Sequence, residues 1–236
     1  MALPVRVRRA PVPNLSVERS CWDAGAEVVC GLDEVGRGAW AGPVTVGAVA
    51  VSADLRRIVK VRDSKVLTLE EREALYPKIV GWAAAWGVGH ASHEECDELG
   101  MTAALRLAAE RALFTMGCEP DRIILDGNHD YLGRPDRVQT VVDGDALCLS
   151  VAAASVVAKV TRDRLMAAEA EHYPAYDFDS NRGYPSPRHK YALAGYGPTA
   201  IHRRSWIYMD YLPWQQALPP SGARGCPPGS QPSLFG

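Results

Sequence analysis

The stretch that decides the fold is Gly31-Leu32-Asp33-Glu34-Val35-Gly36-Arg37-Gly38. It lies between two apolar runs, 28–30 and 44–51, and this pattern predicts a strand, a tight turn and a second strand. Two adjacent carboxylates, Asp33 and Glu34, therefore end the first strand. Because side chains alternate along a strand, both acids can face one site only if the strand ends or bulges at Glu34. The glycines around Arg37 permit such a change of direction and let a ligand approach closely.

Composition excludes few classes of function. The chain has 236 residues and a net charge of −2, with a sequence pI of about 6.3. Nucleic-acid binders are usually basic, although an acidic site and a basic groove would cancel in this sum. No apolar run reaches membrane-spanning length, and the basic segment 1–13 lacks the apolar core of a secretory signal. We therefore expect a cytoplasmic protein without membrane contact, with its six cysteines reduced.

Helices and strands alternate along the chain. Thr68 and Ser92 each precede a Glu by three residues, and this capping-box pattern predicts two helix starts. Strands are expected near 27–33, 43–51, 83–91, 122–126 and 138–142. Helices are expected near 15–25, 68–82, 102–116, 149–172 and 188–194, and a short helix begins at 92. A loop is expected over 173–187 and a last structured segment over 202–212. This order predicts an α/β fold with a mixed central sheet flanked by helices, and a helical C-terminal segment.

Three domain parts follow from composition. Residues 1–14 are rich in Pro and Arg and are expected to form a flexible extension. Residues 15–212 hold the periodic segments and form the expected catalytic domain. Residues 213–236 are dominated by Pro, Gly and Ser and are expected to be a disordered tail.

Three of the expected strands end in or run into carboxylates, Asp33, Asp126 and Asp145. Sites in α/β sheets gather at the carboxyl ends of strands, so these acids are expected to converge. Mg²⁺ and Mn²⁺ prefer oxygen ligands, and two such ions can activate a water in phosphodiester cleavage. From the residues alone, the chain is a candidate metal-dependent phosphoryl-transfer enzyme, such as a DNA nuclease or a resolvase.

The sequence also resembles the family of bacterial type 2 ribonuclease H, ribonuclease HII. The blocks that carry the resemblance stand in family order over about 27–210: 33–38 (DEVGRG), 63–65 (DSK), 124–128 (ILDGN), 144–145 (GD), 152–163 (AAASVVAKVTRD), 183–186 (GYPS), His189 and 202–205 (HRRS). The resemblance implies a ribonuclease H-like fold and a monomeric endonuclease with two ions, Mn²⁺ or Mg²⁺. It would cut the RNA strand of RNA–DNA hybrids, and 5′ of single ribonucleotides in duplex DNA, leaving 5′-phosphomonoesters in ribonucleotide repair and primer removal.

The family's functional residues fall on positions of this chain. Its four metal-binding catalytic acids match Asp33, Glu34, Asp126 and Asp145. Its substrate contacts match Gly36, Arg37 and Gly38, which would recognise the 2′-hydroxyl, and Tyr184, which would sense the junction; Lys65 and Arg204 complete the expected set.

Two positions depart from the family pattern. Asp143 stands where the family usually has Lys, and Val66 stands where it has a second Lys. Asp143 leaves two candidates for the fourth acid, and we choose Asp145 because it follows Gly144 as in the family.

Other charged residues admit two interpretations. Asp163 is interpreted as an ion-pair partner in its helix rather than as a metal ligand. Lys159 and Arg162 either face phosphates or form a solvated helix face, and His202 is interpreted as structural. A non-catalytic hybrid-binding module is the competing class of function; it would require the loss of an acid, and none of the four is missing.

The end of the chain carries a separate motif. Gln231, Leu234 and Phe235 resemble the short peptide that bacterial replication and repair proteins insert into the DNA sliding clamp. The alternative is a disordered end without a partner.

Overall fold

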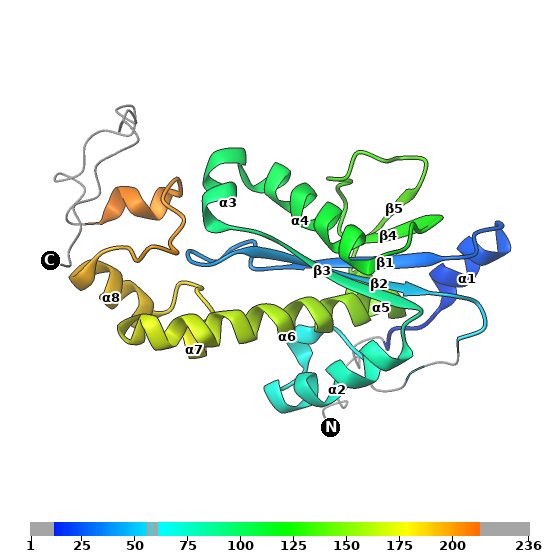
Figure 1. The fold of residues 1–236 in the computed structure, drawn as a ribbon, viewed down its shortest axis with the longest axis horizontal. Coiled ribbons are helices and arrows are strands. Elements are labelled where there is room, and N and C mark those ends of the chain that lie inside the picture. The colour runs from blue at the N-terminus through cyan, green and yellow to red at the C-terminus, as the bar shows by residue number, and fades with distance from the viewer. Residues whose placement is uncertain (1–11, 56–57, 59–60, 213–236) are drawn as a thin grey trace, which may run out of the picture.

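Five strands form one mixed sheet in the order β3-β2-β1-β4-β5 (Figure 1). The structure is a computed structural model, and it describes residues 12–55, 58 and 61–212. The strands are β1 (Val29–Val35), β2 (Val44–Val51), β3 (Ala85–Ala91), β4 (Arg122–Asp126) and β5 (Val138–Val141). The neighbours β1–β2 and β2–β3 are antiparallel, whereas β1–β4 and β4–β5 are parallel. The expected mixed α/β sheet is confirmed.

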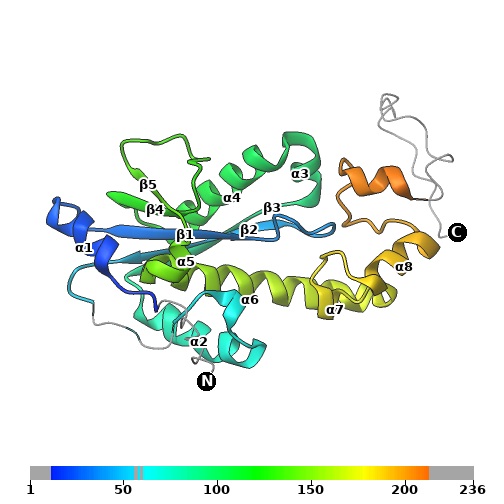
Figure 2. The same cartoon turned by 180° about the vertical axis from the view of Figure 1, so that it is seen from behind.

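Helices cover both faces of this sheet (Figures 1 and 2). On one face lie α3 (His93–Leu99) and α4 (Met101–Met116); on the other lie α2 (Leu69–Trp82) and the long α6 (Leu149–His172). The shorter elements are α1 (Ser16–Asp23), η1 (Ser64–Val66), α5 (Gly144–Leu147), η2 (Pro174–Tyr176), α7 (Phe178–Asn181), α8 (Pro187–Tyr196) and η3 (Ile207–Tyr211). Both capping boxes, at Thr68 and Ser92, are confirmed. Among the described residues, no helix is both long and apolar enough to cross a membrane.

Helix α6 lies unusually close to the sheet because small residues face each other. A Cβ at Gly31 in β1 would stand 2.3 Å from the carbonyl carbon of Ser150 in α6. The first half of α6 presents buried alanines at 152–154 to the apolar layer between the helix and the sheet. This close approach brings Ser155 of α6 to the strand that carries the candidate acids.

The second half of α6 runs past the sheet into a separate apolar cluster (Figure 1). Met166 there packs with Phe178 of α7, Leu193 of α8 and Tyr208 of η3. The helical C-terminal segment is therefore anchored to α6 and to the loop after β1, not to the central sheet.

Three expectations need correction. Strand β1 neither ends nor bulges at Glu34, because its register with β2 is unbroken to Val35↔Thr45. The expected loop 173–187 contains η2 and α7, since Tyr176 and Phe178 bury their rings in the C-terminal cluster. Asp145 lies in the short helix α5, not at the end of a strand. The expected last structured segment over 202–212 is present and contains η3 from Ile207. Residues 1–11 and 213–236 lie outside the described residues.

Candidate active site

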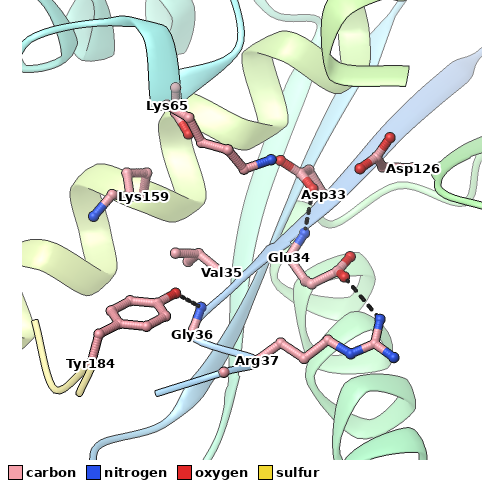
Figure 3. Close-up of a pocket in the computed structure, with 11 residues that line it drawn as sticks. Asp33, Glu34, Val35, Gly36, Arg37, Lys65, Asp126, Lys159 and Tyr184 are labelled. Atoms are coloured by element: carbon pink, nitrogen blue, oxygen red, sulfur yellow. Dashed lines mark hydrogen bonds and ion pairs between the residues drawn. The ribbon is translucent and has the colours of Figure 1, made fainter. Parts of the chain in front are cut away.

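A cleft of about 450 Å³ opens at the carboxyl end of β1 and β4 (Figure 3). Its lining combines three carboxylates, two lysines, an arginine and a tyrosine, together with a glycine-flanked turn. The lining residues are Asp33, Glu34, Val35, Gly36, Arg37, Gly38, Ser64, Lys65, Asp126, Lys159 and Tyr184. Eight of the expected site residues are therefore brought together, and Asp145 lies next to them.

The two adjacent acids reach one cleft without a bulge because a neighbouring strand stops. Parallel pairing of β1 with β4 ends at Leu32↔Leu125, so β1 has an open edge beyond Leu32. Alternation places Asp33 on the α6 face and Glu34 on the α4 face. At an open edge both side chains border the same hollow. The sequence of β1 alone cannot predict this arrangement, because it depends on where the neighbouring strand β4 ends.

Asp33 is the most buried of these acids, with 4% of its surface exposed. Burial raises the pKa of its carboxyl well above the usual range, opposed by the Ser155 hydroxyl, and the carboxylates of Glu34 and Asp126 raise it further. Burial likewise raises the pKa values of Glu34 and Asp126, and neighbouring carboxylates add to the effect in both. A divalent cation between these acids would stabilise their charged forms.

Asp126 and Asp145 meet through the start of α5. The backbone N–H of Gly144 donates to Asp126 Oδ1 at 2.7 Å, and the Asp145 carboxylate raises the pKa of Asp126. Lys65 Nζ donates to Asp145 Oδ2 at 2.9 Å. Burial alone would lower the pKa of Lys65, but this hydrogen bond and the negative charge of Asp145 outweigh it, so the pKa is raised. Asp143 instead is exposed, at the left-handed residue that precedes α5. The geometry thus places Asp145, and not Asp143, beside Asp126.

The donor set fits a hard divalent cation. Glu34 Oε2 is buried and has no hydrogen-bond partner, and Asp33 is buried among like charges. Within the described part of the chain, no three acidic, histidine or cysteine side chains stand close enough to hold an ion without rearrangement. The Lys65 ammonium forms an ion pair with Asp145, and Glu34 Oε1 lies 3.6 Å from Arg37 Nη1. We call Asp33, Glu34, Asp126 and Asp145 the acidic wall.

The opposite side of the cleft is formed by the turn Gly36–Gly38 and by Tyr184, which we call the recognition wall. The backbone N–H of Gly36 donates to the Tyr184 hydroxyl at 3.0 Å (Figure 3). Gly36 has φ +86°, and a Cβ there would stand 2.2 Å from Arg162 Nε. Only glycine fits this position, because the conformation is left-handed and the space is already filled.

The structure separates the remaining charged residues. Arg162 is fully buried and donates to the carbonyl oxygens of Pro43, Ala41 and Arg182. It therefore neither faces a phosphate nor lies on a solvated helix face, and both interpretations are wrong for this residue. Lys159 does line the cleft, and its ammonium donates to Asp163.

The expected ion pair of Asp163 within its helix is confirmed, with Lys159 as its partner. Asp163 is buried and also lies within 4 Å of Arg72 and Arg182, so this pair belongs to an internal ion cluster. Arg204 is exposed and does not line the cleft; its backbone N–H donates to Asp97. Arg203 is fully buried against the recognition wall, so it is not available for the nucleic-acid backbone contact that its place among basic and aromatic residues late in the sequence suggests.

Comparison with known proteins places these features in a family. The family model described as ribonuclease HII matches residues 30–209. Ribonuclease HII of Streptomyces coelicolor is 51% identical over 225 residues, 95% of this chain and 95% of that protein. The crystal structure of ribonuclease H2 from Pyrococcus horikoshii OT3 superposes with a TM-score of 0.65 at 30% identity, covering 78% of this chain and 96% of that one.

A second solved structure is also similar. It is the complex of PCNA with RNase HII from Archaeoglobus fulgidus, with a TM-score of 0.64 at 29% identity over 76% of this chain and 95% of that one. The family-model match over residues 30–209 spans the sheet, α6 and most of the C-terminal helical segment.

Proposed function

This chain belongs to the ribonuclease HII family and is an endoribonuclease that acts on RNA–DNA hybrids, and we propose that it also cuts 5′ of single ribonucleotides embedded in duplex DNA. As a member of this family it depends on a divalent metal ion. The observation that carries the proposal is that one cleft joins an acidic wall to a glycine turn. The first suits phosphodiester hydrolysis, and the second suits close contact with a sugar.

We assign the metal ligands to the acidic wall. Asp33 lies centrally, with Glu34 and Asp126 as its nearest acidic neighbours and Asp145 beyond Asp126. Two ions, Mn²⁺ or Mg²⁺, would there activate a water and stabilise the leaving oxygen. We propose that Lys65 releases Asp145 and contacts a phosphate of the substrate, supported by its side chain being 69% exposed at the cleft. Hydrolysis 5′ of the ribonucleotide leaves a 5′-phosphomonoester on it.

We assign substrate choice to the recognition wall. RNA differs from DNA by the 2′-hydroxyl, which both donates and accepts hydrogen bonds. Backbone groups of Gly36, Arg37 and Gly38 line the cleft and are proposed to bind this hydroxyl. The Tyr184 ring, held by its hydroxyl on Gly36, is proposed to stack on the sugar 3′ of the ribonucleotide. This activity would serve ribonucleotide excision repair and primer removal.

The test uses a labelled DNA duplex with one ribonucleotide, and the same duplex without it as control. With Mn²⁺ or Mg²⁺, we expect one cut 5′ of the ribonucleotide and none in the control or in EDTA. Binding without cutting would instead indicate a hybrid-binding module. Equal cutting of both duplexes would indicate a general metal-dependent nuclease.

We further propose that Gln231, Leu234 and Phe235 bind the sliding clamp; these residues lie outside the described ones. The proposal rests on the peptide pattern and on the clamp complex of the Archaeoglobus relative. A tether of about 18 residues would span roughly 21–25 Å on average, enough to raise the local enzyme concentration on clamp-bound DNA. Purified clamp is titrated with the intact chain and with a chain ending at Gly229. Weaker binding by the shorter chain is expected, with unchanged activity on short duplexes; indistinguishable binding would remove the proposal.

A further inference from the structure

Two histidines behind the recognition wall form a directed hydrogen-bond chain. Thr199 N–H donates to His202 Nδ1 at 2.9 Å, so Nδ1 of His202 is an acceptor. His202 then carries its proton on Nε2, which lies 2.9 Å from His189 Nε2. That nitrogen of His189 must accept, and its Nδ1–H therefore donates to the Tyr184 carbonyl oxygen at 2.9 Å. One backbone donor thus fixes the tautomers of both rings.

This chain is sealed from solvent. His189 and His202 have no exposed surface, and the rings of Tyr176 and Phe178 pack against both of them. Burial lowers the pKa of both imidazoles, that of His202 to about 3. Both rings are neutral at physiological pH, as the directed hydrogen-bond chain requires.

The next residue, Arg203, holds the other side of the same wall. Its guanidinium donates to the carbonyl oxygens of Gly36 at 2.7 Å, Arg37 at 3.0 Å and Gly42 at 3.1 Å. A trans peptide points its C=O and N–H in opposite directions, and no described peptide is cis. The N–H groups of Arg37 and Gly38 therefore point away from the buried guanidinium, and these residues line the cleft.

The contacts close into a ring. Gly36 N–H donates to the Tyr184 hydroxyl, and the Tyr184 carbonyl accepts from His189. His189 accepts from His202, which is covalently joined to Arg203, and Arg203 returns to the Gly36 carbonyl. We propose that His189, His202 and Arg203 are positioning residues that fix the Tyr184 ring and the Gly36–Gly38 turn relative to each other, and thereby set selectivity for an isolated ribonucleotide. This rests on the proposed function of that wall.

A long RNA strand offers many registers and many sugar contacts, whereas an isolated ribonucleotide offers one 2′-hydroxyl. Loss of alignment should therefore harm cleavage at the single ribonucleotide more than cleavage of a hybrid. The readout is the ratio of kcat/KM for the two substrates. A general loss of folded protein lowers both values together and leaves this ratio unchanged.

A matched pair of variants at His202 tests the directed link. His202→Gln keeps a donor near the position of Nε2, whereas His202→Asn keeps only the acceptor position near Nδ1. The Asn variant leaves His189 without its donor, and the selectivity ratio should fall about tenfold. The Gln variant should restore the ratio to within about twofold of the native protein. Equal ratios in the native protein and both variants would overturn the proposal.

Two measurements keep the test decisive if His202→Asn does not fold. Arg203→Lys keeps the charge but cannot reach three carbonyls with a fixed fork, and it should lower the same ratio. Imidazole ¹⁵N NMR of the native protein should show His189 with Nδ1–H and His202 with Nε2–H. The reverse tautomers, or a protonated ring at pH 7, would overturn the proposal without any variant. If the native protein leaves the single ribonucleotide uncut, it is the proposed function that fails, and NMR still decides the hydrogen-bond chain.

Discussion

The two walls of the cleft solve opposite electrostatic problems. In the acidic wall, burial and neighbouring carboxylates raise the pKa values of Asp33, Glu34 and Asp126, and Glu34 keeps a buried oxygen without a hydrogen-bond partner. The recognition wall is held from behind by hydrogen bonds, and its buried arginine donates to backbone carbonyl oxygens. The acidic wall is therefore incomplete without a cation, whereas the recognition wall is preorganised by the fold. Each prediction below alters one of the two walls.

The largest expected effect comes from the acidic wall. Asp145→Asn keeps the shape of the side chain but removes the charge, and cleavage should fall by about three orders of magnitude, or about 4 kcal/mol of transition-state stabilisation. Asp126→Asn should act alike. The matched control is Asp143→Asn, at an exposed left-handed position that Asn tolerates, and it should keep activity within about twofold. Cleavage rates decide the matter: a loss in the Asp143 variant with a normal Asp145 variant would reverse the assignment.

A smaller effect is expected from the recognition wall. Tyr184→Ala removes both the ring and the hydroxyl, and single-ribonucleotide cleavage should fall more than tenfold, consistent with the loss of a stacking contact worth about 1–3 kcal/mol. Tyr184→Phe loses only the bond from Gly36 and should cost about threefold to tenfold. Steady-state kinetics on the two substrates gives the comparison. Equal losses in the two variants would assign the role to the hydroxyl instead of the ring.

The smallest effect concerns stability without metal. Because the pKa of Asp33 is raised in the folded state, its contribution to stability is present below the ordinary carboxyl pKa and is lost as pH rises through the folded-state value. Asp33→Asn replaces the ionising carboxyl with a neutral amide, so the variant does not lose this stability as pH rises. In EDTA the variant should melt a few degrees above the native protein at pH 8, at roughly 2–4 °C for each kcal/mol, and the difference should shrink toward pH 4. A lower melting temperature than native at pH 8 would show that the acidic wall is not strained.

Much of the fold follows from local pattern. The capping boxes at Thr68 and Ser92 satisfy helix N–H groups within a few residues, so their signal is fully contained in the sequence. The bounds of α6 follow in the same way from its run of small and apolar residues.

The parts that were missed depend on distant partners. Whether β1 must bulge at Glu34 depends on where β4 stops, and β4 lies about ninety positions later in the chain. Arg162 and Arg203 carry full charges but are buried, because carbonyl groups from the loop after β1 replace water around them. No local pattern distinguishes such an arginine from one that contacts a phosphate. The family resemblance predicted the four acids, whereas the hydrogen bonds of His189 and His202 behind Tyr184 are visible only in the three-dimensional structure.

The most direct test of a metal-dependent acidic wall beside a preorganised recognition wall is a binding measurement in EDTA. The affinity of the native protein is measured for a duplex with one ribonucleotide and for the same duplex without it. We expect the ribonucleotide duplex to bind more tightly in EDTA, Asp126→Asn to show the same preference, and neither duplex to be cut. Equal affinity for the two duplexes in EDTA, with a preference that emerges only when Mn²⁺ or Mg²⁺ is added, would contradict it.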